Sequence, residues 1–111
     1  MKARSVKAKG RRLQNIVRDA LRDAFPSLEQ EDIKSQTMGM TGEDIVLSPI
    51  ARKSIPYSIE CKNQERLQIW KSLEQAESNT AKDCYPVLII KRNGTKPYVV
   101  IDFHKFISLI K

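Results

Sequence analysis

One stretch of the chain, residues 56–62 (PYSIECK), most constrains its fold, because a buried-strand pattern there contains two opposite charges. As a β-strand it would place alternate side chains on opposite faces of a sheet. The apolar face would hold Tyr57, Ile59 and Cys61, and the other face Ser58, Glu60 and Lys62. Charged side chains rarely lie beside a core unless they are paired or bind a metal. The stretch therefore predicts either an ion pair on an exposed edge strand or a functional carboxylate and lysine.

A second acid, Asp44, stands at the start of another apolar run, and a neighbouring strand would bring its carboxylate close to Glu60. Mg²⁺ prefers oxygen ligands and takes one or two carboxylates from a protein. Asp44 and Glu60 therefore predict a site for Mg²⁺, which Mn²⁺ can replace, with the backbone carbonyl of Cys61 as a third ligand. Lys62 lies on the Glu60 face, where it could orient an attacking water or stabilise charge on a phosphodiester.

Length and charge limit the class of protein. The 111 residues, 41% of them hydrophobic, predict one globular domain spanning 1–111. A net charge of +7 favours a polyanionic partner, of which nucleic acid is the commonest, although an anionic membrane surface would also suit it. The sequence has no apolar run long enough to span a bilayer and no signal-peptide layout. Its two cysteines form no CxxC pair, so we expect a reducing cytoplasm and neither a disulfide framework nor a zinc knuckle. We also expect no small-molecule cofactor.

Basic residues gather in two places. Residues 1–12 contain six basic residues and no acid, and we expect residues 1–10 to be a flexible basic arm, either solvated or lying along phosphates. A basic loop is expected over residues 51–54. The residues predicted to contact nucleic acid are Lys7, Lys9, Arg11, Arg12, Arg52 and Lys53.

Hydrophobic spacing predicts the order of elements. A helix over residues 11–25 presents an apolar stripe of Leu13, Ile16, Val17, Ala20, Leu21 and Ala24. After it we expect strands at 33–40, 44–48 and 56–62, a helix at 66–78, strands at 86–90 and 98–101, and a helix at 102–110. The continuous apolar run 86–90 predicts a strand covered on both faces, parallel to 56–62 through a right-handed crossover. The order α-β-β-β-α-β-β-α predicts an α/β fold with a mixed central β-sheet flanked by helices.

Several of these segments together resemble the PD-(D/E)XK nuclease superfamily, and within it the small Holliday-junction-resolvase-like endonucleases of phages and prophages. The resemblance is carried by residues 10–12 (GRR), 38–45 (MGMTGEDI), 56–63 (PYSIECKN), 69–76 (IWKSLEQA) and 86–93. It implies a restriction-endonuclease-like core, in which Asp44 and Glu60 bind metal and Lys62 assists the attacking water. It also implies that Gln75, on the following helix, supports the site.

Two positions depart from the superfamily pattern. Glu43, rather than proline, precedes Asp44, and the first helix offers Gln14 where many relatives carry a glutamate ligand. The second departure leaves open whether one or two metal ions bind.

The resemblance implies a metal-dependent endonuclease that hydrolyses DNA phosphodiester bonds, with branched DNA such as a Holliday junction as its substrate. It also implies the cytoplasm of a bacterial host, and a homodimer, since a junction needs two symmetric nicks. One alternative is a non-catalytic basic DNA-binding module of a phage replication or packaging assembly. Another is a protein-interaction subunit of such an assembly.

Overall fold

The computed structural model describes residues 3–40 and 42–111, with side chains from Ser5 onward. Its elements are α1 (Ala3–Ala24), a 3₁₀ turn η1 (Gln30–Asp32), β1 (Ile33–Ser35), β2 (Ile45–Leu47), α2 (Pro49–Ser54), β3 (Tyr57–Asn63), α3 (Ile69–Ser78), β4 (Tyr85–Lys91), β5 (Tyr98–Val100) and α4 (Phe103–Ile110). The predicted α/β class is therefore confirmed. Of the helices in this part of the chain, none is both long and apolar enough to cross a membrane.

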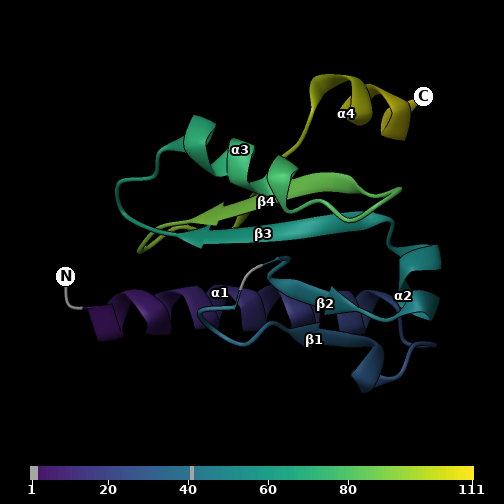
Figure 1. Ribbon diagram of the computed structural model, residues 1–111, viewed down its shortest axis with the longest axis horizontal. Coiled ribbons are helices and arrows are strands. Elements are labelled where there is room, and N and C mark those ends of the chain that lie inside the picture. Colours follow the sequence, from purple (N-terminus) through teal and green to yellow (C-terminus); the bar gives the residue numbers. More distant parts are fainter. Residues whose placement is uncertain (1–2, 41) are drawn as a thin grey trace.

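The larger sheet is built on β3 and β4. These strands are parallel, with Tyr57 opposite Tyr85 and Asn63 opposite Lys91, and β5 pairs antiparallel with β4. Helix α3 connects the two parallel strands, as the sequence predicted. In Figure 1, α3 lies on one side of this sheet, and α1 with the β1–β2 hairpin lies on the other. Strand β3 therefore has covering elements on both faces.

The prediction of one central sheet is wrong, because β1 and β2 form a separate two-stranded antiparallel sheet. Each has three residues, and the strand predicted over 33–40 ends at Ser35. In the described part of the chain, the hairpin meets β3 through a single backbone bond before β2, in which the Asp44 N–H donates to the Ile59 carbonyl at 3.0 Å. One such bond joins the two sheets at a point without extending the ladder.

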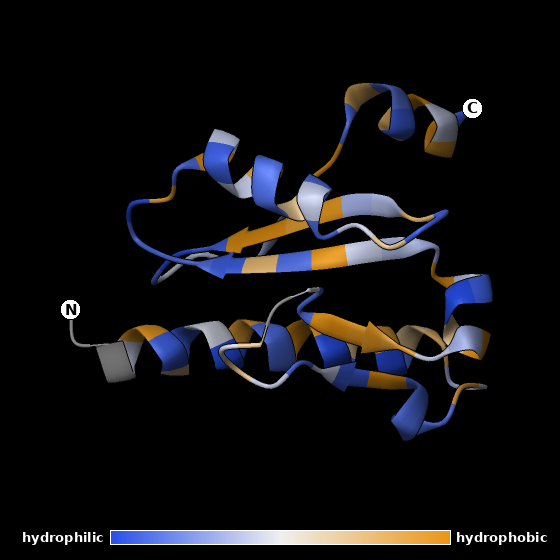
Figure 2. Cartoon of the chain, viewed as in Figure 1, coloured by the Kyte–Doolittle hydropathy of each residue, from blue (hydrophilic) through white to orange (hydrophobic). Residues whose placement is uncertain are grey.

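The hydrophobic core lies between α1, the hairpin and β3. It contains Leu13, Val17, Ile33, Ile45, Leu47, Ala51, Ile55, Ile59, Cys61 and Ile89. Figure 2 shows apolar stretches in the strands that line this interior. The buried stripe of α1 is narrower than predicted, because Ile16, Ala20 and Ala24 are exposed. Leu13 and Val17, four residues apart, carry the packing instead.

Residues 51–54, expected as a basic loop, belong to the short helix α2. Ser48 caps this helix, since its hydroxyl accepts a hydrogen bond from the Ala51 N–H at 3.2 Å, and Pro49 occupies the first turn. Both are strong helix-start signals. Ala51 is fully buried, so one side of the helix is anchored in the core.

The flexible arm expected over residues 1–10 is helical from Ala3 onward, and residues 1–2 lie outside the described part of the chain. Lys9 is 4% exposed, and its ammonium pairs with Glu65 at 3.0 Å. Its backbone carbonyl also accepts a buried hydrogen bond from the Asn63 side chain at 2.8 Å. These contacts hold the first turns of α1 against the end of β3.

Candidate active site

Asp44 is fixed between the hairpin and β3 by three hydrogen bonds. Its N–H donates to the Ile59 carbonyl, and its own carbonyl accepts from the Gln36 N–H at 2.8 Å. Its Oδ2 accepts a hydrogen bond from the Cys61 N–H at 2.7 Å. The carboxylate is therefore held at the edge of β3, beside the residue that follows Glu60.

Glu60 lies in the middle of β3 and is only 3% exposed. Its Oε2 is buried and has no hydrogen-bond partner among the described residues. Burial, then the neighbouring Asp44 carboxylate, raises the pKa of Glu60 to about 8, against the opposing effects of Lys62 and Asn79. A cation bound to Oε2 would stabilise the charged form of this carboxylate.

The alternative of a solvent-exposed ion pair on an edge strand is wrong. Strand β3 is at the edge of its sheet, but Asp44 covers that edge beside Glu60, which is buried. Lys62 is half-buried and belongs to none of the ion pairs found in the described part of the chain.

One pocket of about 190 Å³ is lined by Asp44, Glu60, Lys62 and Gln75 together. The four residues come from the end of the hairpin loop, from β3 and from α3. The structure thus brings together the residues predicted to be catalytic, while their roles in catalysis stay predictions. Cys61 also lines the pocket, and burial raises the pKa of its thiol, so its sulfur stays protonated.

Gln14 is a member of this pocket that the residues alone did not assign to a role. It is 6% exposed, and its Oε1 is buried without a hydrogen-bond partner among the described residues. In the sequence, its position next to Leu13, on the buried side of α1, is the signal that this side chain points inward. No group of three His, Cys, Asp or Glu side chains suited to a metal occurs in residues 3–40 and 42–111. The available donors are therefore two carboxylates with amide and backbone oxygens, a set that suits Mg²⁺ better than zinc.

A second, polar pocket of about 410 Å³ adjoins the first and shares Lys62, Gln64 and Gln75 with it. Arg66 and Lys71 add two exposed cations to its lining. The sequence reading did not single out either one, although both flank the start of α3. The carboxylate pair therefore opens toward a positively charged surface.

Four of the six residues predicted to contact nucleic acid are exposed. Lys7 lines the carboxylate pocket, and Arg11 and Arg12 lie on the outer side of α1. Lys53 is exposed near the end of α2. Their contact with nucleic acid stays a prediction. The side chains of the other two basic residues near the N-terminus, Lys2 and Arg4, lie outside the described part of the chain.

The other two predicted contacts, Lys9 and Arg52, are engaged within the protein. The guanidinium of Arg52 donates to the Tyr57 carbonyl at 2.9 Å and pairs with Glu43. Lys9 is buried against Glu65, as described above. Both side chains hold elements of the fold together, so we withdraw them as phosphate contacts.

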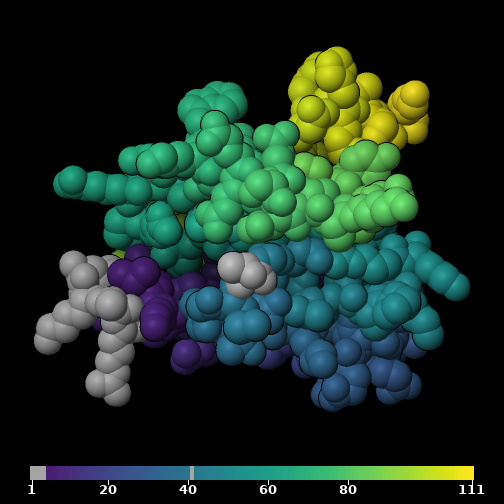
Figure 3. Space-filling model, in the orientation of Figure 1, coloured from purple at the N-terminus to yellow at the C-terminus, as the bar shows by residue number. Residues whose placement is uncertain are grey.

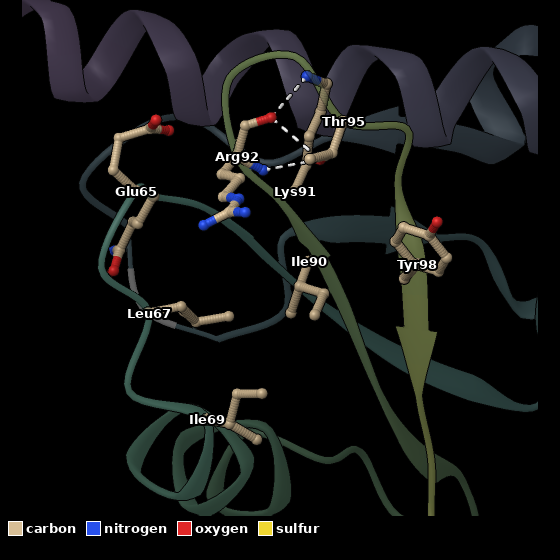
Figure 4. Close-up of a pocket in the computed structure, with 9 residues that line it drawn as sticks. Glu65, Leu67, Ile69, Ile90, Lys91, Arg92, Thr95 and Tyr98 are labelled. Carbon is tan, nitrogen blue, oxygen red and sulfur yellow. Dashed lines mark hydrogen bonds between the residues drawn. The ribbon is translucent and has the colours of Figure 1, made fainter.

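A further pocket of about 340 Å³, shown in Figure 4, lies between the start of α3 and the turn after β4. Its wall is largely apolar, with Leu67, Ile69 and Ile90. The nearby turn is closed by hydrogen bonds between Arg92 and Thr95. None of the predicted catalytic residues lines it, and its acid Glu65 is already paired with Lys9. It is therefore a weaker candidate for phosphodiester chemistry.

An α/β core with two neighbouring carboxylates and a lysine on adjacent segments, followed by a helix with a glutamine, is the arrangement expected from the resemblance to PD-(D/E)XK nucleases. A family model described as "Phage putative PDDEXK endonuclease" matches residues 5–110. The chain therefore belongs to this family. No curated protein and no solved structure matches the chain.

Proposed function

We propose that this chain is a metal-dependent endodeoxyribonuclease that hydrolyses the phosphodiester backbone of branched DNA. The observation that carries the proposal is the buried Oε2 of Glu60, which has no hydrogen-bond partner among the described residues and lies beside Asp44 in a pocket that Lys62 also lines. Two acids forced together away from water are costly unless a cation is shared between them.

Asp44 and Glu60 would hold the cation. The backbone groups of Ile59 and Cys61 point toward Asp44, whereas the Gln64 N–H bonds to Lys91 on β4. Because alternate residues of a strand point their backbone groups to opposite edges, the Cys61 carbonyl belongs to the Asp44 side and suits a third ligand. Gln14 Oε1 is a fourth candidate oxygen. When bound, Mg²⁺ or Mn²⁺ would neutralise charge on the phosphate and lower the pKa of a bound water.

Lys62 would act on the attacking water or on the charge that develops at phosphorus. It lies two residues after Glu60 on the same strand, lines the same pocket and has no competing ion pair in the described part of the chain. Gln75 projects from α3 into this pocket, where its amide would orient Lys62 or the water. Their proximity to the acid pair is the support for these roles.

The adjoining polar pocket, with Arg66 and Lys71, would receive the DNA backbone next to the scissile bond. Lys7 extends the same positive surface from α1. Phosphate contacts of this kind position a duplex without reading its sequence. Preference for a branched substrate, and a homodimer that cuts it symmetrically, rest on the resemblance to junction-resolving endonucleases.

The test is incubation of labelled duplex, single-stranded, flap and four-way-junction DNA with the protein in Mg²⁺, in Mn²⁺ and in EDTA. We expect metal-dependent cuts, most efficient on the junction, with products mapped to the nucleotide. Glu60→Gln should abolish cleavage while retaining DNA binding.

Glu31→Gln is the matched control, because Glu31 is an exposed acid on η1 whose substitution should leave cleavage unchanged. Binding of every DNA without cleavage under either metal would overturn the proposal and favour a non-catalytic DNA-binding module. Absence of DNA binding would favour a protein-interaction subunit.

A further inference from the structure

The C-terminal helix α4 turns its apolar face to solvent, whereas an ordinary surface helix turns that face to the protein core. Its apolar residues Phe103, Phe106, Ile107 and Ile110 follow the i, i+3, i+4, i+7 spacing of one helical face. A stripe of this kind normally packs on the protein core. Here its members are between 38% and 66% exposed, and no residue of α4 is buried.

The polar side of α4 faces the body of the protein instead. The Lys105 ammonium lies 3.8 Å from the centre of the Tyr85 ring and 5.4 Å from that of Tyr57. Lys105 and Ser108 line a gap of about 470 Å³ between α4 and the body. The Asp102 side chain caps the helix by accepting from the Lys105 N–H at 2.9 Å. Figures 1 and 3 show the result, a helix that projects from the rest of the molecule.

A groove of about 550 Å³ lies near the base of α4, between α3 and the larger sheet. Its apolar lining includes Leu73, Pro86, Val100 and Trp70, of which the last is 81% exposed. From the apolar stripe of α4 only the first residue, Phe103, lines this groove. The protein therefore carries an apolar helix face and an apolar groove that its own helix leaves open.

The groove has an acidic rim, and α4 contains no acid. Glu74, Glu77 and Asp102 line the groove, which gives it an acidic rim on a chain whose net charge is +7. Helix α4 contains no acid and is followed by Lys111, whereas His104 and Lys105 line the gap on its other side. An acidic rim opposes DNA and anionic lipid, and it is compatible with an apolar helix face that carries no acid.

We propose that α4 of one copy of this chain docks in the α3 groove of a second copy, in a two-fold dimer. The same two surfaces meet twice in such an interface, so each copy supplies one helix and one groove. Trp70, Phe103 and Phe106 are 81%, 66% and 48% exposed, so covering them would remove about 300–500 Å² from water, at roughly 150–250 Å² per whole aromatic side chain. Ile107, Ile110 and the groove wall add to this area, toward the roughly 800 Å² per partner of a stable interface. This inference concerns the geometry of association and stands apart from the catalytic chemistry proposed above.

The first test is the mass of the full-length protein by sedimentation equilibrium at about 100 μM, where an interface of this size should be populated. We expect twice the chain mass of 12.7 kDa. Phe106→Ser should weaken the dimer roughly 30-fold or more, as expected for a central aromatic contact. Ile50→Ser is the matched control, because Ile50 is 62% exposed on α2, and this variant should remain dimeric.

The second test separates helix-in-groove docking from other modes of association. A groove variant, Glu74→Lys with Glu77→Lys, should also weaken the dimer, and far-UV circular dichroism should show that each variant is folded. In a heterodimer of the groove variant and Phe106→Ser, the native α4 of the first copy meets the native groove of the second, so one of the two docking contacts is intact. Both contacts are impaired in either homodimer, so native mass spectrometry should show the heterodimer in excess of either homodimer. A monomeric native protein, a Phe106→Ser dimer of unchanged affinity, or a mixture without heterodimer would each overturn the proposal.

Discussion

The Cys61 N–H donates to Asp44 Oδ2 at 2.7 Å, so the acid supplied by the hairpin is anchored to the backbone of the strand that carries Glu60. The same carboxylate therefore contributes both to the fold and to the proposed metal site. Two substitutions at position 44 separate these contributions, since asparagine keeps an acceptor oxygen and alanine does not.

Asp44→Ala should lower the free energy of unfolding by about 1–3 kcal/mol, because it leaves the Cys61 N–H without its acceptor. Asp44→Asn should lose less, yet bind Mg²⁺ no better than the alanine variant. Urea denaturation and calorimetric titration with Mg²⁺ measure the two effects. Equal stability of the two variants would show that the hydrogen bond contributes little.

Glu60 predicts how stability depends on pH in the absence of metal. Its pKa is about 8 in the folded protein against an ordinary value of 4.5, so the folded state holds the proton more tightly than the unfolded state. The stabilisation that the Glu60 proton gives the folded state is therefore complete below about pH 4.5 and is lost as the pH rises through about 8. Melting temperatures should fall across this window more steeply for the native protein than for Glu60→Gln, and Mg²⁺ should reverse the fall at pH 8. Parallel profiles for the two proteins would contradict the predicted burial of this acid.

Lys9 and Lys7 should respond differently to reversal of charge. Lys9→Glu places a carboxylate in a buried position against Glu65 and should cost about 2 kcal/mol or more of unfolding free energy. Lys7→Glu changes an exposed residue at the pocket, so stability should hold while affinity for DNA falls. Thermal melts and fluorescence anisotropy distinguish these outcomes. Equal destabilisation by both substitutions would argue against the anchored start of α1.

Lys62→Met should lower the rate of DNA cleavage by about 10²–10³-fold while leaving Mg²⁺ binding intact, as expected for loss of a group that acts on the reacting atoms. Single-turnover cleavage at saturating protein measures the chemical step. Lys34→Met, at an exposed lysine of β1, is the control and should cleave normally. A reduction confined to DNA affinity would reassign Lys62 to binding.

Arg66 and Lys71 predict the salt dependence of DNA binding. Substituting either one by glutamine should lower the slope of log affinity against log salt by about one, because one phosphate contact is lost. Affinity should fall to a similar extent for different DNA sequences, since these contacts carry no base information. Arg52→Gln should leave the slope unchanged and reduce stability instead, because its guanidinium pairs with Glu43 and binds the Tyr57 carbonyl.

The sequence predicted the parts of the fold that depend on local pattern. Alternation in residues 56–62 and the apolar run at 86–90 were sufficient for the parallel pair β3–β4, and that pair places Glu60 and Lys62 on one strand. The approach of Asp44 to Glu60 was also predicted, but from neighbouring strands of one sheet, whereas the hairpin that carries Asp44 and the strand that carries Glu60 belong to separate sheets that meet at the Asp44 N–H. The end of the strand predicted at residues 33–40 was harder to locate, because the alternation of side chains continues past Ser35 although the pairing with β2 ends there.

What the sequence could not supply was the choice of distant partners. The sequence predicted that Lys9 belongs to a basic arm. It lies instead four residues before Leu13 on the buried stripe, and its ammonium binds Glu65, fifty-six positions later. The partner of Arg52 was equally hard to predict, because Glu43 lies nine positions earlier and no local rule pairs the two residues. Trp70 occupies a helix that packs on the sheet, but its rotation about that helix leaves it exposed. Each outcome depends on three-dimensional packing rather than on neighbouring residues.

The acid pair is divided between two sheets, with Asp44 at the hairpin and Glu60 on β3. Neither sheet alone holds both carboxylates, so a half-folded or proteolytically opened copy would keep them apart. If the protein cuts DNA as proposed, incomplete copies leaving the ribosome would be harmless to the chromosome around them. Cutting would begin only after α1 had brought the hairpin against β3, which makes completion of folding itself a safeguard.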